Sequence, residues 1–196
     1  MTLTHFAIIA VCAYLLGSLS FAIIVSKLTL GKDIRNYGSG NAGLTNAYRT
    51  MGAKKTLLVL LGDIAKGAAA VSIGMVLAGP VGKLTAGIFV ILGHMFPLYF
   101  GFKGGKAVAT SIGVLIPLAF WQLLIAVCIC LFLIWRSGFV SLGSLALVTA
   151  MPILLALSGK FGLLPLSLII LALVFWSHRE NIRRLAKGEE KTWIKK

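Results

Sequence analysis

Residues 107–134 read AVATSIGVLIPLAFWQLLIAVCICLFLI, an apolar run that contains no charged residue and one proline, Pro117. A helix of about 20 apolar residues spans the hydrocarbon core of a bilayer. Proline breaks or bends a helix, because it lacks an N–H group and clashes with the preceding turn. The run therefore predicts either one long membrane span or two shorter helices that meet near Pro117.

Five further apolar segments lie around this run, at about 5–26, 56–78, 84–100, 139–157 and 162–177. Hydrophobic residues make up 59% of the 196 residues and charged residues 12%, and the mean hydropathy is +0.98. A soluble domain of this size needs more charged surface, so we expect lipid to be the solvent for most of the chain. The sequence predicts an all-α, polytopic membrane protein that forms a single domain over residues 1–196.

The positive charges distinguish six spans from seven. Cytoplasmic loops of membrane proteins carry an excess of Lys and Arg. Seven spans with the N-terminus outside place the basic residues of 27–55, of 101–106, Arg136 and the tail after Ser177 together in the cytoplasm. Six spans would separate Arg136 and the tail from the other two groups, so we predict seven spans and a cytoplasmic C-terminus. The helix at about 107–117 is then too short for a core of ~30 Å, and we expect it to pack within protein or beside a polar cavity.

The formal net charge is +14, from 19 Lys and Arg against 5 Asp and Glu. In a soluble protein this excess would indicate nucleic acid binding, but here the positive-inside bias and anionic lipid headgroups explain it. We therefore predict membrane lipids, and no nucleic acid, among the partners, and part of the excess is available for an anionic substrate. Cys12, Cys128 and Cys130 lie in apolar runs and are expected to be buried packing residues.

The first polar segment that suits substrate binding reads RNYGSGNAGLTN over residues 35–46 and is followed by Arg49. Its glycines let backbone N–H groups turn toward a common anion, and its Ser and Asn side chains offer further hydrogen bonds. A glycine-rich turn at a helix interface would explain the glycines, but it does not require so many polar groups beside Arg49. The candidate substrate contacts in this segment are Gly38, Ser39, Gly40, Asn41, Asn46 and Arg49.

The second polar segment is Lys103-Gly104-Gly105-Lys106, which opens the short helix expected from about Ala107. Glycines before a helix N-terminus present free N–H groups and the positive end of the helix dipole to a phosphate, and the two lysines add charge. The spacing of a Walker loop is missing. The alternative interpretation is an anchor to lipid headgroups.

The third polar segment reads HRENIRRLAKGEE over residues 178–190. His178 and Asn181 share one face of a helix and can point into the same pocket, and His is the side chain best able to exchange a proton near neutral pH. The alternative is a basic tail at the membrane interface. Ser141 stands at the start of an apolar segment, where an N-cap and a ligand contact are both compatible with the sequence.

Two charged residues lie within a predicted span. Asp63 and Lys66 are three residues apart, so they can pair on a helix, which lowers the cost of burying both. We favour a structural pair over a proton relay. His94, near the end of the next apolar segment, is assigned no role.

These three polar segments resemble the three motifs of the PlsY family, bacterial membrane glycerol-3-phosphate acyltransferases that use acyl phosphate as the acyl donor. The matching stretches, in the order and spacing of the family, are GSGNAGLTN at 38–46 with Arg49, GFKGGKAVAT at 101–110 and HRENIRRLAKGEE at 178–190. The resemblance implies transfer of a fatty acyl group to the 1-hydroxyl of sn-glycerol 3-phosphate, giving lysophosphatidate and phosphate in phospholipid biosynthesis. It also implies a seven-helix fold in the bacterial inner membrane, a site on the cytoplasmic side, and no metal or organic cofactor. A monomer is compatible with it.

The resemblance also assigns roles to individual residues. The predicted catalytic residues are Ser39, Arg49, Lys106, His178 and Asn181. The predicted substrate-binding residues are Gly38, Gly40, Asn41, Asn46, Lys103, Gly104, Gly105 and Ser141. Glu189 is expected to be structural. The acceptor of the hydroxyl proton stays open between His178 and a phosphate oxygen of a substrate.

Three positions depart from the residues that are usual in the family. Ala42 and Leu44 stand where Pro and Ala are usual, which costs loop rigidity only, and Ala107 stands where Gly is usual. An alanine would be unfavourable there at positive φ. We expect Ala107 to be helical, where alanine is preferred.

Other functions are compatible with parts of the sequence. A transporter of anions or organophosphates also uses broken helices and basic loops, but its site lies near the bilayer midplane, often between internal repeats, and no repeat is evident here. A lipid-anchoring protein would explain the basic tail but not the polar groups of residues 35–46. Acyltransferases that depend on acyl-CoA often carry H-x-x-x-x-D, and no histidine of this chain is followed by Asp at that spacing.

Overall fold

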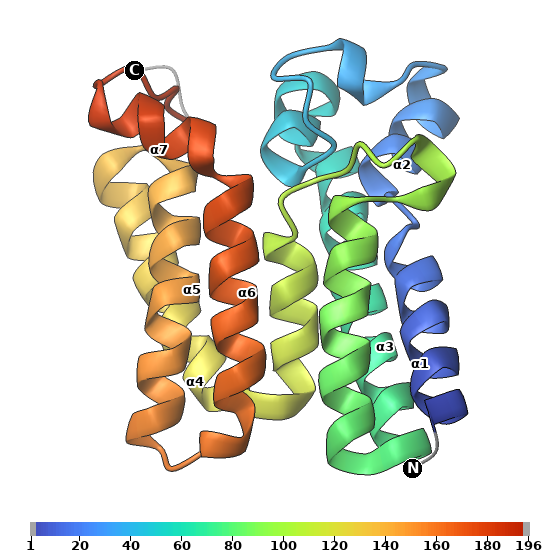
Figure 1. Ribbon diagram of the computed structural model, residues 1–196. Coiled ribbons are helices and arrows are strands. Elements are labelled where there is room, and N and C mark those ends of the chain that lie inside the picture. The colour runs from blue at the N-terminus through green and yellow to red at the C-terminus, as the bar shows by residue number, and fades with distance from the viewer. Residues whose placement is uncertain (1–2, 194–196) are drawn as a thin grey trace. The chain divides into compact units, whose positions relative to one another are not determined.

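The structure of the protein is a computed structural model, which describes residues 3–193. Within this range the chain is helical and contains no strand, so the predicted all-α class is confirmed (Figure 1). The chain divides between Leu118 and Ala119 into two compact units, which we call unit 1 and unit 2. The elements in chain order are α1 (Leu3–Gly17), α2 (Phe21–Leu30), η1 (Ile34–Asn36), α3 (Leu44–Met95), η2 (Leu98–Phe100), α4 (Val108–Ser137), α5 (Val140–Leu157), η3 (Phe161–Leu163), α6 (Leu164–Ser177) and α7 (Arg179–Ala186).

The long helix α3 of unit 1 is broken twice. Its backbone leaves the helical conformation at Gly52 and again at Ala78 and Gly79, directly before Pro80. The pieces on either side of the second break pack closely, because a Cβ added at Gly74 would lie 2.5 Å from the carbonyl oxygen of Gly82. The predicted apolar segments 56–78 and 84–100 therefore correspond to separate helical pieces that fold back on each other.

The run that contains Pro117 is also broken, two residues after the proline. Ala119 has φ −153° and ψ 52°, which divides α4 into a short piece before this residue and a longer piece after it. The short piece packs against α3 so closely that a Cβ at Gly67 would collide with the carbonyl oxygen of Thr110. The prediction of two helices that meet near Pro117, the shorter packed within protein, is confirmed at the level of the backbone.

The helices are long and apolar enough for several membrane crossings. Among the described residues, four helical segments satisfy this condition, and the bent pair Phe161–Ser177 and Arg179–Ala186 would bring the number to five. The two longest segments contain the breaks described above. Large side chains such as Val76 and Trp135 are exposed on the helices, as expected for a surface that lipid covers. The protein is therefore a multi-pass membrane protein.

The cysteines only partly follow the sequence prediction. Cys130 is buried, but Cys12 and Cys128 are exposed on their helices. The prediction that all three are buried is wrong for these two, because a lipid-facing position accepts any apolar side chain and does not require burial in protein.

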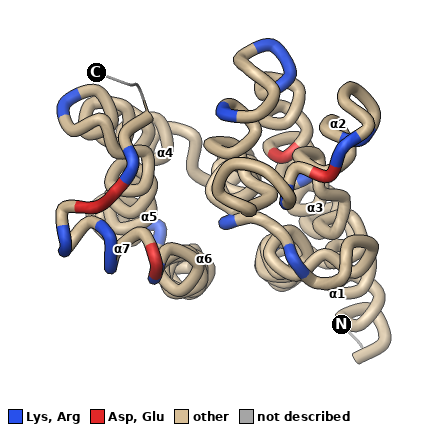
Figure 2. Tube along the Cα trace, turned by 90° about the horizontal axis from the view of Figure 1, so that it is seen from above, with Lys and Arg blue, Asp and Glu red and all other residues tan. Residues whose placement is uncertain are grey.

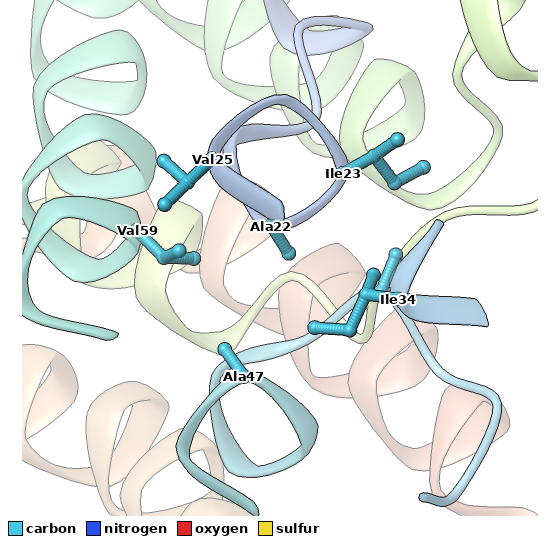
Figure 3. Close-up of a cluster of buried hydrophobic side chains, with 7 residues drawn as sticks. Ala22, Ile23, Val25, Ile34, Ala47 and Val59 are labelled. Atoms are coloured by element: carbon cyan, nitrogen blue, oxygen red, sulfur yellow. The ribbon is translucent and has the colours of Figure 1, made fainter. Parts of the chain in front are cut away.

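A small hydrophobic core in unit 1 fixes the polar loop of residues 31–43. Ala22, Ile23 and Val25 of α2 pack with Ile34 of η1 and with Ala47 and Val59 of α3 (Figure 3). Ile34 and Ala47 are fully buried. Apolar residues within the loop and on both sides of it therefore hold the loop against α2 and α3.

Unit 2 consists of the second part of α4 with α5, α6 and α7. Helices α4 and α5 approach closely, since a Cβ at Gly143 would lie 2.6 Å from the carbonyl oxygen of Cys130. The last helix, α7, is bent by 63° from the segment that precedes it. The chain then returns to the start of α5, where the N–H of Trp193 donates to the carbonyl oxygen of Gly138 at 2.8 Å. Figure 2 shows that most charged parts of both units are basic, in keeping with the net charge of +14.

Candidate functional site

The first polar segment forms a loop that is shaped by one buried amide. The side-chain Oδ1 of Asn46 accepts from the N–H of Ser39 at 2.8 Å. Its Nδ2 lies 3.0–3.2 Å from three backbone carbonyl oxygens of the loop, those of Ile34, Tyr37 and Asn41. The sequence predicts a substrate contact for Asn46, but its amide is occupied by the loop. We assign Asn46 to holding the loop in shape.

The tip of this loop keeps Ser39 on the surface. Gly38 has φ 62°, a left-handed conformation that glycine adopts without strain. A Cβ at Gly38 would also collide with Oδ1 of Asn46. Ser39 and Arg49 are exposed, and Asn41 is half-buried. The side chains predicted to meet substrate are thus accessible, while the backbone that carries them is fixed.

The second polar segment is held by backbone hydrogen bonds to the end of α3. The N–H of Gly104 donates to the carbonyl oxygen of Met95 at 3.1 Å, and the N–H of Gly105 donates to that of His94 at 3.2 Å. The expectation that these N–H groups are free for a phosphate is therefore wrong. The glycines are needed for close approach, since a Cβ at Gly105 would lie 2.8 Å from the carbonyl oxygen of Ala42 and collide with the His94 ring.

The N-terminus of α4 still offers donors to an anion. The first intrahelical bond of α4 runs from the N–H of Ser111 to the carbonyl oxygen of Ala107 at 2.8 Å. The N–H groups of residues 108–110 therefore have no partner within the helix, as in the first turn of any α-helix. Lys106 is partly buried directly before this turn, and Lys103 is exposed. A helix N-terminus with an adjacent lysine suits a phosphate.

Ala107 adopts a conformation that the sequence did not lead us to expect. Its φ is 60°, and α4 begins only at Val108, so the expectation that Ala107 is helical is wrong. The residue is 1% exposed, and the tight turn between Gly105 and the helix determines its backbone. Left-handed φ costs a residue with a Cβ about 1–2 kcal/mol, so this chain carries strain where glycine would relieve it.

Replacing Ala107 by Gly is therefore expected to stabilise the protein by about 1 kcal/mol. The measurement is thermal unfolding of the purified protein in detergent. Ala109→Gly is the matched control, because Ala109 lies in the helix two residues later and glycine there should destabilise by about 1 kcal/mol. A fall in Tm for both variants would contradict the strained turn.

Arg35 joins the first and second polar segments. Its Nε and Nη2 donate to the two carboxylate oxygens of Asp33 at 3.0 and 2.8 Å. Its Nη1 donates to the carbonyl oxygen of Phe100 at 2.5 Å and lies 3.3 Å from that of Lys103. The hydrogen bonds from Arg35 hold the pKa of Asp33 below its usual range, so the pair is charged. Sequence reasoning assigned no role to Arg35, although the Asp-x-Arg spacing around a short helix was visible.

Unit 1 therefore gathers the predicted residues of its two polar segments at one end. Figure 1 shows the loop of residues 31–43 and the segment of residues 101–107 at the end of the unit opposite the start of α1. The bonds from Arg35 to the carbonyl groups of residues 100 and 103 connect the two segments directly.

In unit 2, two of the three predicted residues, Ser141 and Asn181, bind the same carboxylate. Glu190 Oε1 accepts from Ser141 Oγ at 2.7 Å and from Asn181 Nδ2 at 2.6 Å, and its Oε2 accepts from Arg184 Nε at 2.8 Å. Glu189, expected to be the structural carboxylate, is exposed, so that expectation is wrong by one position. Ser141 is not the N-cap of α5, because Phe139 occupies that position.

The charge of Glu190 is stabilised by its partners. Burial alone would raise the pKa of Glu190, but the hydrogen bonds from Asn181, Ser141 and Arg184, together with the positive charge of Arg184, outweigh it and lower the pKa. A carboxylate whose pKa is lowered in the folded state contributes stability above its unfolded pKa. That contribution is lost as the pH falls through the folded pKa.

Glu190→Gln is accordingly expected to destabilise unit 2 at pH 7 by about 1.5–3 kcal/mol, the range for hydrogen bonds to a charged group. The variant should also lose less stability than the parent when the pH falls through the lowered pKa of Glu190. Thermal unfolding at pH 7 and near pH 4 measures both effects, with Glu189→Gln as the matched control. Equal losses for the two variants at pH 7 would contradict the role of Glu190.

His178 lies at the bend between α6 and α7 and is 3% exposed. Its Nδ1 lies 2.8 Å from the carbonyl oxygen of Val174. A carbonyl oxygen only accepts, so Nδ1 carries the hydrogen of this bond. In the neutral ring the lone pair is then on Nε2, which is the state that a proton acceptor requires.

Comparisons with known proteins point to one family of enzymes. The family model described as glycerol-3-phosphate acyltransferase matches residues 7–188. The glycerol-3-phosphate acyltransferase of Lawsonia intracellularis (strain PHE/MN1-00) is 53% identical over 184 residues, which are 93% of this chain and 93% of that protein.

Two crystal structures of PlsY (YgiH), an integral membrane glycerol 3-phosphate acyltransferase, share the fold. The glycerol 3-phosphate form has a TM-score of 0.90 and 37% sequence identity, and the alignment covers 95% of this chain and 94% of that chain. The lysophosphatidic acid form has a TM-score of 0.88 and 34% identity, with the same coverage of both chains. The chain therefore belongs to the glycerol-3-phosphate acyltransferase family and is an acyltransferase of the PlsY type.

Proposed function

We propose that the protein transfers a fatty acyl group from an acyl phosphate to the 1-hydroxyl of sn-glycerol 3-phosphate. The products are lysophosphatidate and inorganic phosphate. The observation that carries this proposal is the Arg35-linked pair of polar segments, which brings a helix N-terminus and Lys106 next to the loop that leads to Arg49. The glycerol 3-phosphate form and the lysophosphatidic acid form of the related PlsY (YgiH) support the same acceptor and product.

The chemistry of an acyl phosphate fits this set of residues. It is a mixed anhydride, so the enzyme needs mainly to orient two anions and to offset their repulsion. The hydroxyl oxygen attacks the acyl carbon, and the bond from that carbon to the phosphate oxygen breaks. Cationic groups stabilise the phosphate as it leaves. We propose that Ser39, Arg49 and Lys106 act on the phosphates.

We propose that His178 accepts the hydroxyl proton through Nε2, and that Asn181 and Ser141 also take part in substrate binding. The bond from Nδ1 to Val174 supports this assignment, because it leaves the ring in the required tautomer. A phosphate oxygen of the substrate is the other candidate acceptor. A His178→Ala variant that keeps near-normal turnover would assign the proton to the phosphate.

The membrane topology belongs to the same proposal. We propose seven spans in the bacterial inner membrane, with the N-terminus outside and the polar segments and C-terminus in the cytoplasm, and a monomeric enzyme. The breaks at Ala78–Gly79 and at Ala119 support this number, since each divides a long helix into two helical pieces.

The experiment that tests the proposed reaction uses the protein purified in detergent. Labelled glycerol 3-phosphate is supplied with palmitoyl phosphate and, separately, with palmitoyl-CoA, and Arg49→Ala is assayed in parallel. We expect lysophosphatidate only from palmitoyl phosphate, and its loss in the variant. Product from palmitoyl-CoA instead would overturn the donor and keep the acceptor.

A further inference from the structure

A cluster of buried polar side chains lies inside unit 1, next to the second polar segment. Asp63 and Lys66 come from α3 and are 2% and 3% exposed. The Lys66 Nζ lies 2.8 Å from Asp63 Oδ1, so the predicted pairing is confirmed. Lys66 also donates to the carbonyl oxygens of Gly17 and Leu19 at 3.0 and 2.7 Å. The ammonium group therefore links α3 to the break between α1 and α2.

His94 completes this cluster through one side of its ring. Its Nδ1 lies 3.0 Å from Lys66 Nζ, 3.1 Å from Thr110 Oγ1 and 3.4 Å from Asp63 Oδ1. Thr110 belongs to the first turn of α4. Three groups from two helices therefore fix the orientation of the imidazole.

The other edge of the same ring lies against Gly105. A Cβ added at Gly105 would collide with Nε2 of His94 and would lie 3.1 Å from its Cε1. The His94 carbonyl oxygen accepts from the N–H of Gly105 at 3.2 Å. His94 therefore supports the second polar segment with both its ring and its backbone.

Stability alone does not account for such a cluster. Burying an ion pair costs desolvation that its attraction only partly repays, and an apolar replacement is often as stable. The cluster holds the His94 ring in one orientation against Gly105, the residue that precedes Lys106. A site residue displaced by about 1 Å loses up to about 100-fold in rate, so such support has a functional consequence.

We propose that His94 is a positioning residue for glycerol 3-phosphate binding. It acts through Gly105 on Lys106 and on the first turn of α4, while Asp63, Lys66 and Thr110 hold its ring. This inference rests on the proposed function, because it takes Lys106 and that turn as the phosphate site.

Two substitutions at His94 separate the two edges of the ring. Asn places a polar atom near the position of Nδ1 and removes the edge that contacts Gly105. Gln reaches toward the position of Nε2 but leaves the partners of Nδ1 unsatisfied. If His94 positions the segment, His94→Asn keeps a Tm near that of the parent and weakens glycerol 3-phosphate binding about fivefold or more. His94→Gln should lower the Tm more and weaken binding less.

The readout is the Kd of labelled glycerol 3-phosphate for the detergent-purified protein, measured without an acyl donor. It stays informative if the acyl phosphate proposal fails. His5→Asn, an exposed residue of α1, is the control and should leave Kd and Tm unchanged. A Kd for folded His94→Asn within about twofold of the parent, well below the loss expected from misplacement, would overturn the proposal.

A second variant covers the case in which His94→Asn does not fold. Gly105→Ala places a methyl group against the ring from the other side and 2.8 Å from the carbonyl oxygen of Ala42. It should therefore also weaken binding about fivefold or more, and it should lower the Tm. In a folded double variant, the two changes should be less than additive, because Asn removes the ring atoms that the methyl group meets. Normal binding by Gly105→Ala would overturn the proposal.

Discussion

Lys106→Gln is expected to lower kcat for acyl transfer by about 100- to 1,000-fold, the usual cost of removing one donor that stabilises charge in the transition state. Lys106 is partly buried directly before the first turn of α4, where its charge adds to the helix dipole. Glutamine keeps most of the side-chain length and loses the charge. The fold should be retained, because the backbone of this segment is held by Gly104 and Gly105.

The measurement is the steady-state rate with palmitoyl phosphate and glycerol 3-phosphate, with kcat and KM determined separately. Lys54→Gln is the matched control, since Lys54 is exposed and is part of neither polar segment. A loss of kcat below about tenfold, or a rise in KM alone, would contradict a role in the transition state. Either result would leave Lys106 with a role in substrate binding only.

The sequence was sufficient for the helical class and for the break in the longest apolar run. Lipid offers no hydrogen bonds, so a spanning segment must satisfy its own backbone, and an apolar run of about 20 residues does so as a helix. Such runs are visible in the sequence. The effect of Pro117 was also visible, because proline cannot continue a helix without strain. The structure places the resulting break at Ala119.

The sequence was also sufficient to locate the polar segments, but it did not show which of their groups bind substrate. Asn46, Gly104 and Gly105 all use their donors on backbone carbonyl groups. The carbonyls that meet Gly104 and Gly105 belong to residues about ten positions earlier, at the end of α3. Their proximity depends on packing that no local pattern records.

The roles of Glu190 and His94 also differ from what the sequence predicts, because they too depend on packing between distant segments. Glu189 and Glu190 are indistinguishable in a basic tail, and the irregular chain after α7 decides which carboxylate meets Ser141. His94 lies in an apolar segment, and its partners come from residues 63, 66 and 110. Contacts between distant segments determine both residues, so sequence reasoning missed both.

Lys66→Met is expected to destabilise the protein by about 3–5 kcal/mol, because it leaves one member of a buried ion pair without its partner. The side chains of Lys66 and Asp63 are only 1% and 2% exposed. The substitution also removes the donor that serves the carbonyl oxygens of Gly17 and Leu19 at the break between α1 and α2. Such groups need a partner in protein when the surroundings are lipid.

The double variant Asp63→Leu with Lys66→Met separates these two effects. It removes both charges and leaves no charge unpaired, although the two carbonyl groups and Nδ1 of His94 still lose partners. It should therefore be more stable than Lys66→Met alone. Asp63→Leu alone should also fall below the double variant, because it leaves the ammonium buried without its carboxylate. Thermal unfolding of the four proteins in one detergent gives the order of Tm. Additive losses, with the double variant least stable, would mean that the pair contributes no coupling and that the carbonyl groups at the break dominate the role of Lys66.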